Sequence, residues 1–113
     1  MRYLLLLHVD ERGFERLTPA EQVAGMERYR AYSETLAMAG ALVATGSLTS
    51  ASAATQIRTI GGKVVPMDGP YAESKEQIGG FYLIEAPDRE TALALAAQCP
   101  AVGHGVVEVR EVR

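Results

Sequence analysis

The 113-residue chain is poor in several residue types, and each scarcity excludes a class of protein. A single cysteine, Cys99, forbids an intramolecular disulfide and points to a reducing compartment. Eleven basic against fourteen acidic residues give a net charge of −3, which argues against a nucleic-acid binder with a basic stripe over the phosphates. No apolar run approaches the roughly 20 residues of a membrane span, and the start MRYLLLLH is too short for a secretory signal. We therefore expect a cytoplasmic protein that binds neither membranes nor nucleic acid directly.

The rest of the composition is that of an ordinary globular protein, with 48% hydrophobic and 22% charged residues. The length corresponds to one domain, residues 1–113, with enough buried surface for a single core. The two histidines, His8 and His104, are separated by most of the chain and do not have the spacing of zinc ligands. We expect no metal and no cofactor, and we expect Cys99 to be core packing rather than a nucleophile.

The hydrophobic pattern predicts two helices and a series of short strands. One helix is expected over residues 18–40, opened by a Thr18–Glu21 capping box, and the other over residues 89–98, capped by Asp88. Strands are expected over residues 2–9, 42–46, 56–60, 63–66, 80–85 and 106–112. This order builds an α+β fold, a ferredoxin-like antiparallel sheet with both helices on one face.

The first expected strand is apolar on both of its faces. Tyr3, Leu5 and Leu7 lie on one face, and Leu4 and Leu6 lie on the other with His8. Two helices cover only one face of such a sheet, so the other face needs a cover, and an identical subunit supplies it. The sequence therefore predicts a homodimer packed through the open sheet face.

The segment 67–80, MDGPYAESKEQIGG, concentrates charged residues after a turn. The tripeptide Asp68-Gly69-Pro70 predicts a tight, rigid turn that holds Asp68 in one place. Glu73 and Lys75 follow closely, and such groups can supply an acid, a base or a clamp for a polar ligand. The alternative is a solvated loop between strands.

This segment resembles the signature of the YCII-related family in its DGPF subfamily, D-G-P-F-x-E-x-K-E followed by a glycine-led strand. The chain has Tyr71 where the signature has phenylalanine. The opening MRYLLLLH and the ending VEVREV are also similar to the family, so the resemblance covers essentially the whole chain. It implies a ferredoxin-like fold of the dimeric α/β-barrel superfamily.

The resemblance also bears on function. Related YCII members look like enzymes with a His–Asp pair whose histidine lies on the first helix. Residues 22–37 contain no histidine, so the chain departs from that pattern. Some genes of the family accompany extracytoplasmic-function sigma factors, which implies a sigma factor as a candidate protein partner.

Strand directions bring the candidate site residues to one end of the sheet. His8 ends the first strand, and the 67–79 loop and His104 each lead into one of its antiparallel neighbours. We predict His8 as a catalytic base and Asp68 as its orienting partner. The candidate ligand-binding residues are Asp10, Thr45, Tyr71, Glu73, Lys75 and His104. Each histidine has a structural alternative, a buried hydrogen-bonded residue for His8 and an exposed loop residue for His104.

Taken together, these features favour a small dimeric domain that binds a small polar or aromatic metabolite in a cleft near the Asp-Gly-Pro-Tyr turn. Three alternatives stay open. One is a lyase- or isomerase-type enzyme that uses a His/Asp pair, and another is a regulatory protein that acts with a sigma factor. The last is a structural dimer without a ligand.

Overall fold

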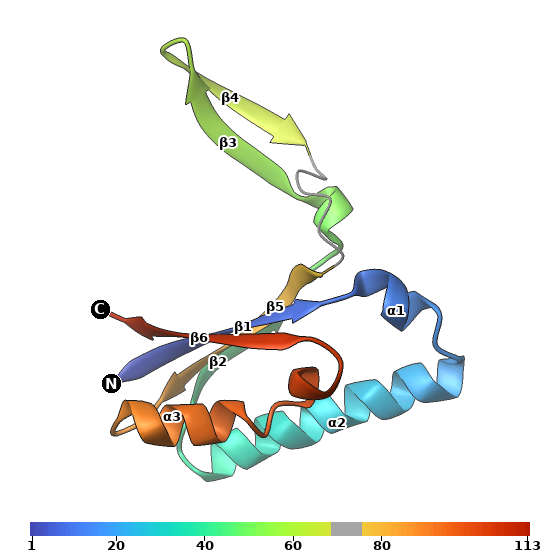
Figure 1. Cartoon of the computed structure of the whole chain (residues 1–113), viewed down its shortest axis with the longest axis vertical. Helices are drawn as coiled ribbons and strands as arrows, with labels where there is room; N and C mark the ends of the chain where they lie inside the picture. Colours follow the sequence, from blue (N-terminus) through green and yellow to red (C-terminus); the bar gives the residue numbers. More distant parts are fainter. Residues whose placement is uncertain (69–75) are drawn as a thin grey trace.

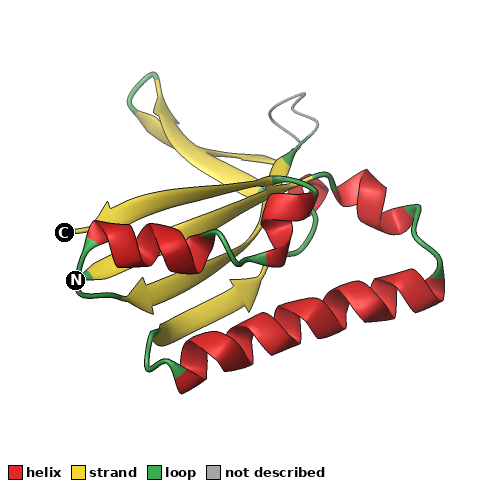
Figure 2. Cartoon of the chain, turned by 60° about the horizontal axis from the view of Figure 1, so that its bottom comes forward, coloured by secondary structure: helices red, strands yellow, loops and turns green. Residues whose placement is uncertain are grey.

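The computed structural model describes residues 1–68 and 76–113 (Figure 1). Four strands form an antiparallel sheet in the order β2-β5-β1-β6. They are β1 (Arg2–Val9), β2 (Leu42–Ser47), β5 (Gln77–Glu85) and β6 (Val106–Val112). The helices α2 (Pro19–Met38) and α3 (Arg89–Ala96) both cover one face of this sheet (Figure 2). The predicted ferredoxin-like α+β fold is thereby confirmed.

Local signals set the ends of the long helix α2. Thr18 Oγ1 accepts a hydrogen bond from the Glu21 backbone N–H at 3.2 Å, and Glu21 Oε1 accepts from the Thr18 N–H at 2.9 Å. This is the predicted capping box, with Pro19 in the first turn. The helix ends at Met38, and Gly40 then adopts a left-handed conformation with φ of 69°. The bond from the Thr18 N–H lowers the pKa of the Glu21 carboxyl, so the box is lost only as the pH falls into the acid range.

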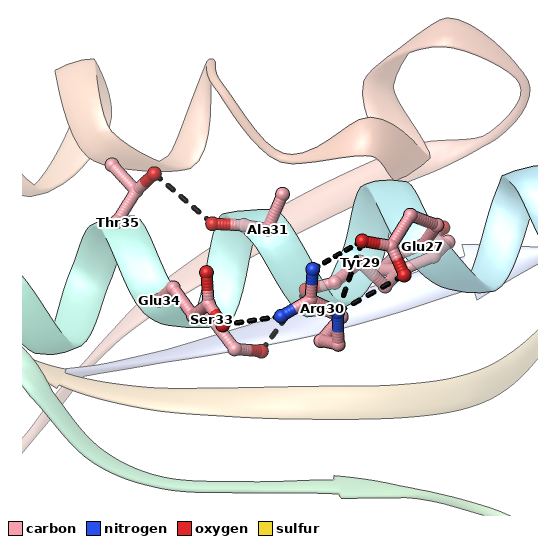
Figure 3. A network of polar contacts seen from close by, with 7 residues as sticks. All are labelled: Glu27, Tyr29, Arg30, Ala31, Ser33, Glu34 and Thr35. Atoms are coloured by element: carbon pink, nitrogen blue, oxygen red, sulfur yellow. Dashed lines mark hydrogen bonds and ion pairs between the residues drawn. The ribbon is translucent and has the colours of Figure 1, made fainter.

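Removing the cap should weaken the fold measurably. We expect Thr18→Ala to lower the free energy of unfolding by about 1 kcal/mol, because the backbone N–H of Glu21 loses its side-chain acceptor. Thr35→Ala is the matched control, since Thr35 is an exposed threonine in the last turn of α2 whose hydroxyl donates to the Ala31 carbonyl (Figure 3). Urea unfolding measures the free energy of unfolding of both variants. An equal decrease for Thr18→Ala and Thr35→Ala would contradict a specific capping role for Thr18.

The strand β1 separates its side chains between the two faces of the sheet. Tyr3, Leu5 and Leu7 face the helices and are 1%, 0% and 6% exposed. They form the core with Leu36 of α2 and Ile84 of β5. The half-buried Leu4 and Leu6 lie on the other face, which no described helix covers (Figure 2). We call this side the open sheet face.

Cross-strand rows make the β1 and β5 part of the open sheet face apolar, whereas its β6 part carries Glu108 and Arg110. Leu4 of β1 is paired with Leu83 of β5, and Leu6 is paired with Phe81. The ring of Phe81 in turn lies over Gly46 of β2, where an added Cβ would come within 2.8 Å of a ring carbon. Antiparallel partners share a face, so these residues form one continuous patch.

The helix α2 packs on the sheet only through its second half. Tyr32 and Leu36 are buried, whereas Val23 and Met26 are 64% and 58% exposed. At about 3.6 residues per turn Val23 and Tyr32, nine residues apart, lie on opposite sides of the helix, and the first turns of this 20-residue helix also extend past the sheet (Figure 1). The helix's own pattern and the length of the neighbouring strands therefore both decide which of these side chains are covered.

The strands β3 (Thr55–Ile60) and β4 (Lys63–Asp68) form a separate two-stranded sheet, which we call the arm. The turn between them is the predicted Gly61-Gly62 pair, with φ of 58° and 80°. The arm rises from the His8 end of the main sheet, on the side away from α2 and α3 (Figure 1). Three short helical segments also occur, α1 (Glu11–Glu15), η1 (Ala51–Ala53) and η2 (Pro100–Gly103). Within the described residues, no helix is both long and apolar enough to cross a membrane.

Candidate functional site

A histidine and a glutamate meet on the open sheet face. His8 Nε2 lies 2.9 Å from Oε1 of Glu108. Glu108 is the β6 partner of Leu6, so the contact runs diagonally between neighbouring strands on one face. The His8 side chain is 28% exposed and that of Glu108 is 43% exposed, so water and small solutes reach the pair.

The carboxylate at His8 differs from the expected one. Asp68 ends β4, where its Oδ1 accepts a hydrogen bond from Thr55 Oγ1 at 3.0 Å and closes the base of the arm. The ladder between β3 and β4 pairs Thr55 with Asp68 and holds the carboxylate there. The expected His8–Asp68 pair is therefore corrected to His8–Glu108. The alternation of side chains along β6 predicts that Glu108 and Arg110 share a face. No local pattern predicts the register between β1 and β6 that places Glu108 next to His8.

Two of the predicted ligand-binding residues make local structural contacts. Asp10 is the N-cap of α1, and its Oδ1 accepts from the Arg12 N–H at 3.1 Å. Thr45 Oγ1 donates to the Phe81 carbonyl at 2.9 Å. Thr45 is paired with Tyr82, whose buried side chain faces the helices, so Thr45 lies on the face opposite His8.

The second histidine lies on the helix side of the sheet. His104 Nε2 is 3.1 Å from the hydroxyl of Tyr29 on α2, and the two rings meet edge to face. Its side chain is exposed, as its structural alternative predicted. His8 and His104 therefore share one end of the sheet but lie on opposite faces. Three further predicted residues, Tyr71, Glu73 and Lys75, lie outside the described residues.

An open pocket adjoins His8. Its volume is 390 Å³, and its lining is formed by Leu48, Thr49, Ser50, Ala51, Ala54, Gln56, Gln77 and Ile78. Ile78 of β5 is the direct cross-strand partner of His8, so the pocket and the histidine lie side by side on one face. The lining combines apolar side chains with hydroxyl and amide groups, so it offers both apolar and polar contacts to a bound molecule.

A carboxylate fixes the loop that forms the far wall of the pocket. Glu11 Oε1 accepts from the Ala51 N–H at 2.9 Å, and its Oε2 accepts from Ser50 Oγ at 2.8 Å. Only Asp10 separates Glu11 from the end of β1. The segment that follows the His8 strand therefore also anchors this wall of the pocket. The small-residue segment 47–55, SLTSASAAT, carries no local sequence signal for this contact, because its partner Glu11 is distant in the chain.

Glycines allow the strands to close tightly at this end of the sheet. A Cβ on Gly105 would lie 2.2 Å from the backbone oxygen of His8, and one on Gly79 would lie 2.6 Å from Val9 Cγ2. At Gly105 the obstacle is backbone, so only glycine fits there, whereas a Cβ at Gly79 would force the Val9 side chain to move. This close approach sets the position of His8 relative to β6.

Side chains on the helix side are held in uncharged forms. Burial raises the pKa of the Tyr29 hydroxyl to about 12. Cys99 is 2% exposed, and burial raises the pKa of its thiol, so it packs as a small apolar residue, as predicted. Among residues 1–68 and 76–113, no cluster of three metal-ligating side chains occurs. The outer surface of α2 carries a solvated network in which Arg30 pairs with Glu27 and Glu34 (Figure 3).

The fold defines a small ferredoxin-like α+β domain with a solute-accessible pocket at one end of its sheet. Residues 1–113 match the family of YCII-related domains, and the chain belongs to that family. The relative called Uncharacterized protein R00369, from Rhizobium meliloti (strain 1021), is 34% identical over 96 residues, which is 85% of this chain and 77% of that protein. The finer DGPF assignment rests on a motif that lies mostly in residues 69–75, outside the described residues, and stays a prediction.

A solved structure shares the architecture. The chain is similar to 5-chloro-2-hydroxyhydroquinone dehydrochlorinase (TftG) from Burkholderia phenoliruptrix AC1100, solved in complex with 2,5-dihydroxybenzoquinone. The TM-score is 0.57, the sequence identity is 14%, and the match covers 100% of this chain and 94% of that one. At this identity the likeness shows the fold alone.

Proposed function

We propose that the protein is a cytoplasmic homodimer that binds a small polar or aromatic metabolite in the pocket beside His8. One observation carries the proposal: the pocket wall at Ile78 and the His8–Glu108 pair are neighbours on the same face and at the same end of the sheet. Apolar side chains such as Leu48 and Ile78 suit a ring or an alkyl body, and the hydroxyl groups of Thr49 and Ser50 suit its polar substituents.

A proton-transfer enzyme is the second candidate, and the 2.9 Å contact between His8 Nε2 and Glu108 Oε1 favours it. When Nε2 carries the proton and donates a hydrogen bond to the Glu108 carboxylate, Nδ1 is the unprotonated ring nitrogen. Nδ1 can then accept a proton from a bound ligand. Glu108 then stabilises the imidazolium that forms. This arrangement suits lyase- or isomerase-type chemistry, in which a proton leaves carbon or oxygen.

The dimer in this proposal is supported by the apolar patch of Leu4, Leu6, Phe81 and Leu83 on the open sheet face. A second sheet seated there would remove these side chains from water. It would also add a wall to the open side of the pocket, because Ile78 and His8 lie on the same face. The site would then be a cleft between two copies.

The test compares the two histidines. The probe is 2,5-dihydroxybenzoquinone, chosen because TftG is solved with it, together with simple hydroxylated benzenes. We expect His8→Ala to weaken binding by about tenfold or more, the effect of losing one charged or polar contact. His104→Ala is the matched control and should bind within about twofold, because His104 lies on the other face. Calorimetry of wild type and both variants measures this.

The same samples separate binding from catalysis. If the chain is an enzyme, Glu108→Gln should lower turnover by about 100-fold while the probe affinity changes little. The reason is that the Glu108 carboxylate stabilises the His8 imidazolium, which forms during proton transfer and not on binding. A pure binding module shows no turnover in any variant. Equal affinity in wild type, His8→Ala and His104→Ala would contradict the proposed site.

A further inference from the structure

The arm exposes apolar side chains on both of its faces. On one face lie Ile57, which is 69% exposed, and Val64, which is 72% exposed, next to Pro66. On the other, Ile60 and Met67 are 52% and 39% exposed and lie among the polar side chains of Gln56, Arg58 and Lys63. An antiparallel sheet normally packs its more apolar face against another element, so the exposed face of Ile57, Val64 and Pro66 indicates that something else covers the arm.

The arm is also too isolated to be stable by its own contacts. A two-stranded hairpin alone is marginally stable at best in water. The radius of gyration of the chain is 16.0 Å, whereas a compact chain of this length has about 13 Å. The extended shape results from the projecting arm (Figure 1). The chain therefore has an element that its own body does not support.

The position of the arm points to what covers it. The arm leaves the main sheet on the side opposite α2 and α3, and it leans back over the open sheet face (Figure 1, Figure 2). The uncovered side chains of Leu4, Leu6 and Phe81 lie on that same side. A body seated on the open sheet face would therefore contact the arm as well, so one occupant accounts for both exposed apolar surfaces.

Apolar complementarity and symmetry favour a second copy of this chain as that occupant. Arg58 and Lys63 lie on the arm face of Ile60, so the middle of the opposite face, with Ile57, Val64 and Pro66, carries no charged side chain. It matches the apolar row of Leu4, Leu6 and Phe81 on the open sheet face. In a twofold-symmetric dimer each arm contacts the open sheet face of the other subunit. The same residues therefore form both contacts.

We propose that the arm packs against the second subunit of a homodimer, with the face of Ile57, Val64 and Pro66 as its contact surface. The inference rests on the sheet-to-sheet dimer of the proposed function. It goes beyond that dimer because it makes the arm an intersubunit element that is folded against the partner and not against its own body. Ala54, just before the arm, and Gln56 in β3 both line the pocket, so contact of the arm with the partner would also hold that wall of the pocket in place.

Amide hydrogen exchange of the unmodified protein tests the contact directly. At concentrations where light scattering gives a dimer, the amides of β3 and β4 should exchange about tenfold more slowly than in samples diluted to the monomer. The amides of α2 serve as the internal control and should change little. A dimer whose arm exchanges equally fast at both concentrations overturns the arm contact and leaves the sheet-to-sheet dimer intact. A monomer at every concentration overturns both.

Variants of exposed residues give an independent measurement. We expect Ile57→Asp combined with Val64→Asp to raise the dimer dissociation constant by about 10- to 100-fold, because two charges would enter an apolar contact. Met38→Asp is the matched control, since Met38 is 90% exposed on the helix side, and it should leave the constant unchanged. Sedimentation equilibrium at several concentrations provides the values. An arm variant that dissociates no more readily than Met38→Asp would overturn the proposal.

Discussion

Replacing Leu6 by aspartate should convert the dimer into a folded monomer. Leu6 lies half-buried in the middle of the open sheet face, between Phe81 of β5 and Glu108 of β6. In a sheet-to-sheet dimer the new carboxylate would be buried against apolar side chains and close to Glu108, whose own carboxylate already has Arg110 at 4.0 Å. We expect the dimer dissociation constant to rise by about 1,000-fold, equivalent to about 4 kcal/mol.

Light scattering behind a sizing column measures this change. Wild type at micromolar concentration should have twice the chain mass of 12.1 kDa, and the variant should have that mass once. Leu93→Asp is the control, because Leu93 is 40% exposed on α3, away from the open sheet face, and should remain dimeric. A wild-type chain that is monomeric, or a Leu6→Asp chain that is still dimeric, would contradict the sheet-to-sheet dimer.

Circular dichroism should show that the Leu6 variant keeps its fold. In the monomer the new carboxylate points to water, so the core is not affected. The neighbouring Leu5 is 0% exposed against the helices, and Leu5→Asp should prevent folding because an unpaired charge would enter the core. The two adjacent positions thus separate association from folding.

Replacing Gly105 by alanine should have a large effect on stability. A Cβ at this position would lie 2.2 Å from the backbone oxygen of His8, and neither backbone can rotate away as a side chain could. The start of β6 must then move from β1, with strain and lost strand contacts. We expect the free energy of unfolding to fall by about 3 kcal/mol, at the upper end of the range for overpacking.

Gly103 provides the control for this change. It lies two residues earlier in the same segment, and an added Cβ would meet nothing within 4 Å. Gly103→Ala should therefore melt within a few degrees of wild type, whereas Gly105→Ala should melt about 10 °C lower or more. Because the shift separates β6 from β1, Gly105→Ala should also weaken binding of the quinone probe at His8 and Glu108. Equal melting temperatures for the two variants would show that β6 can move without cost.

The sequence by itself determined the elements and the class of the fold. The capping box at Thr18, the Gly61-Gly62 turn and the N-cap at Asp88 act through bonds within a few residues, so a local pattern suffices to find them. The two apolar faces of β1 could also be predicted, because the alternation of side chains in a strand is a local property. From these features alone the ferredoxin-like order follows.

Only the tertiary structure decided which residues meet at the site. The partner of His8 depends on the register between β1 and β6, and that register is set by the close approach of Gly105 to His8, which are almost a hundred residues apart. The ladder within the arm holds Asp68 at Thr55, so the motif residue with the strongest sequence signal is not the carboxylate at His8. Local patterns carry no information on such distant contacts, because their geometry results from the packing of strands that the sequence separates.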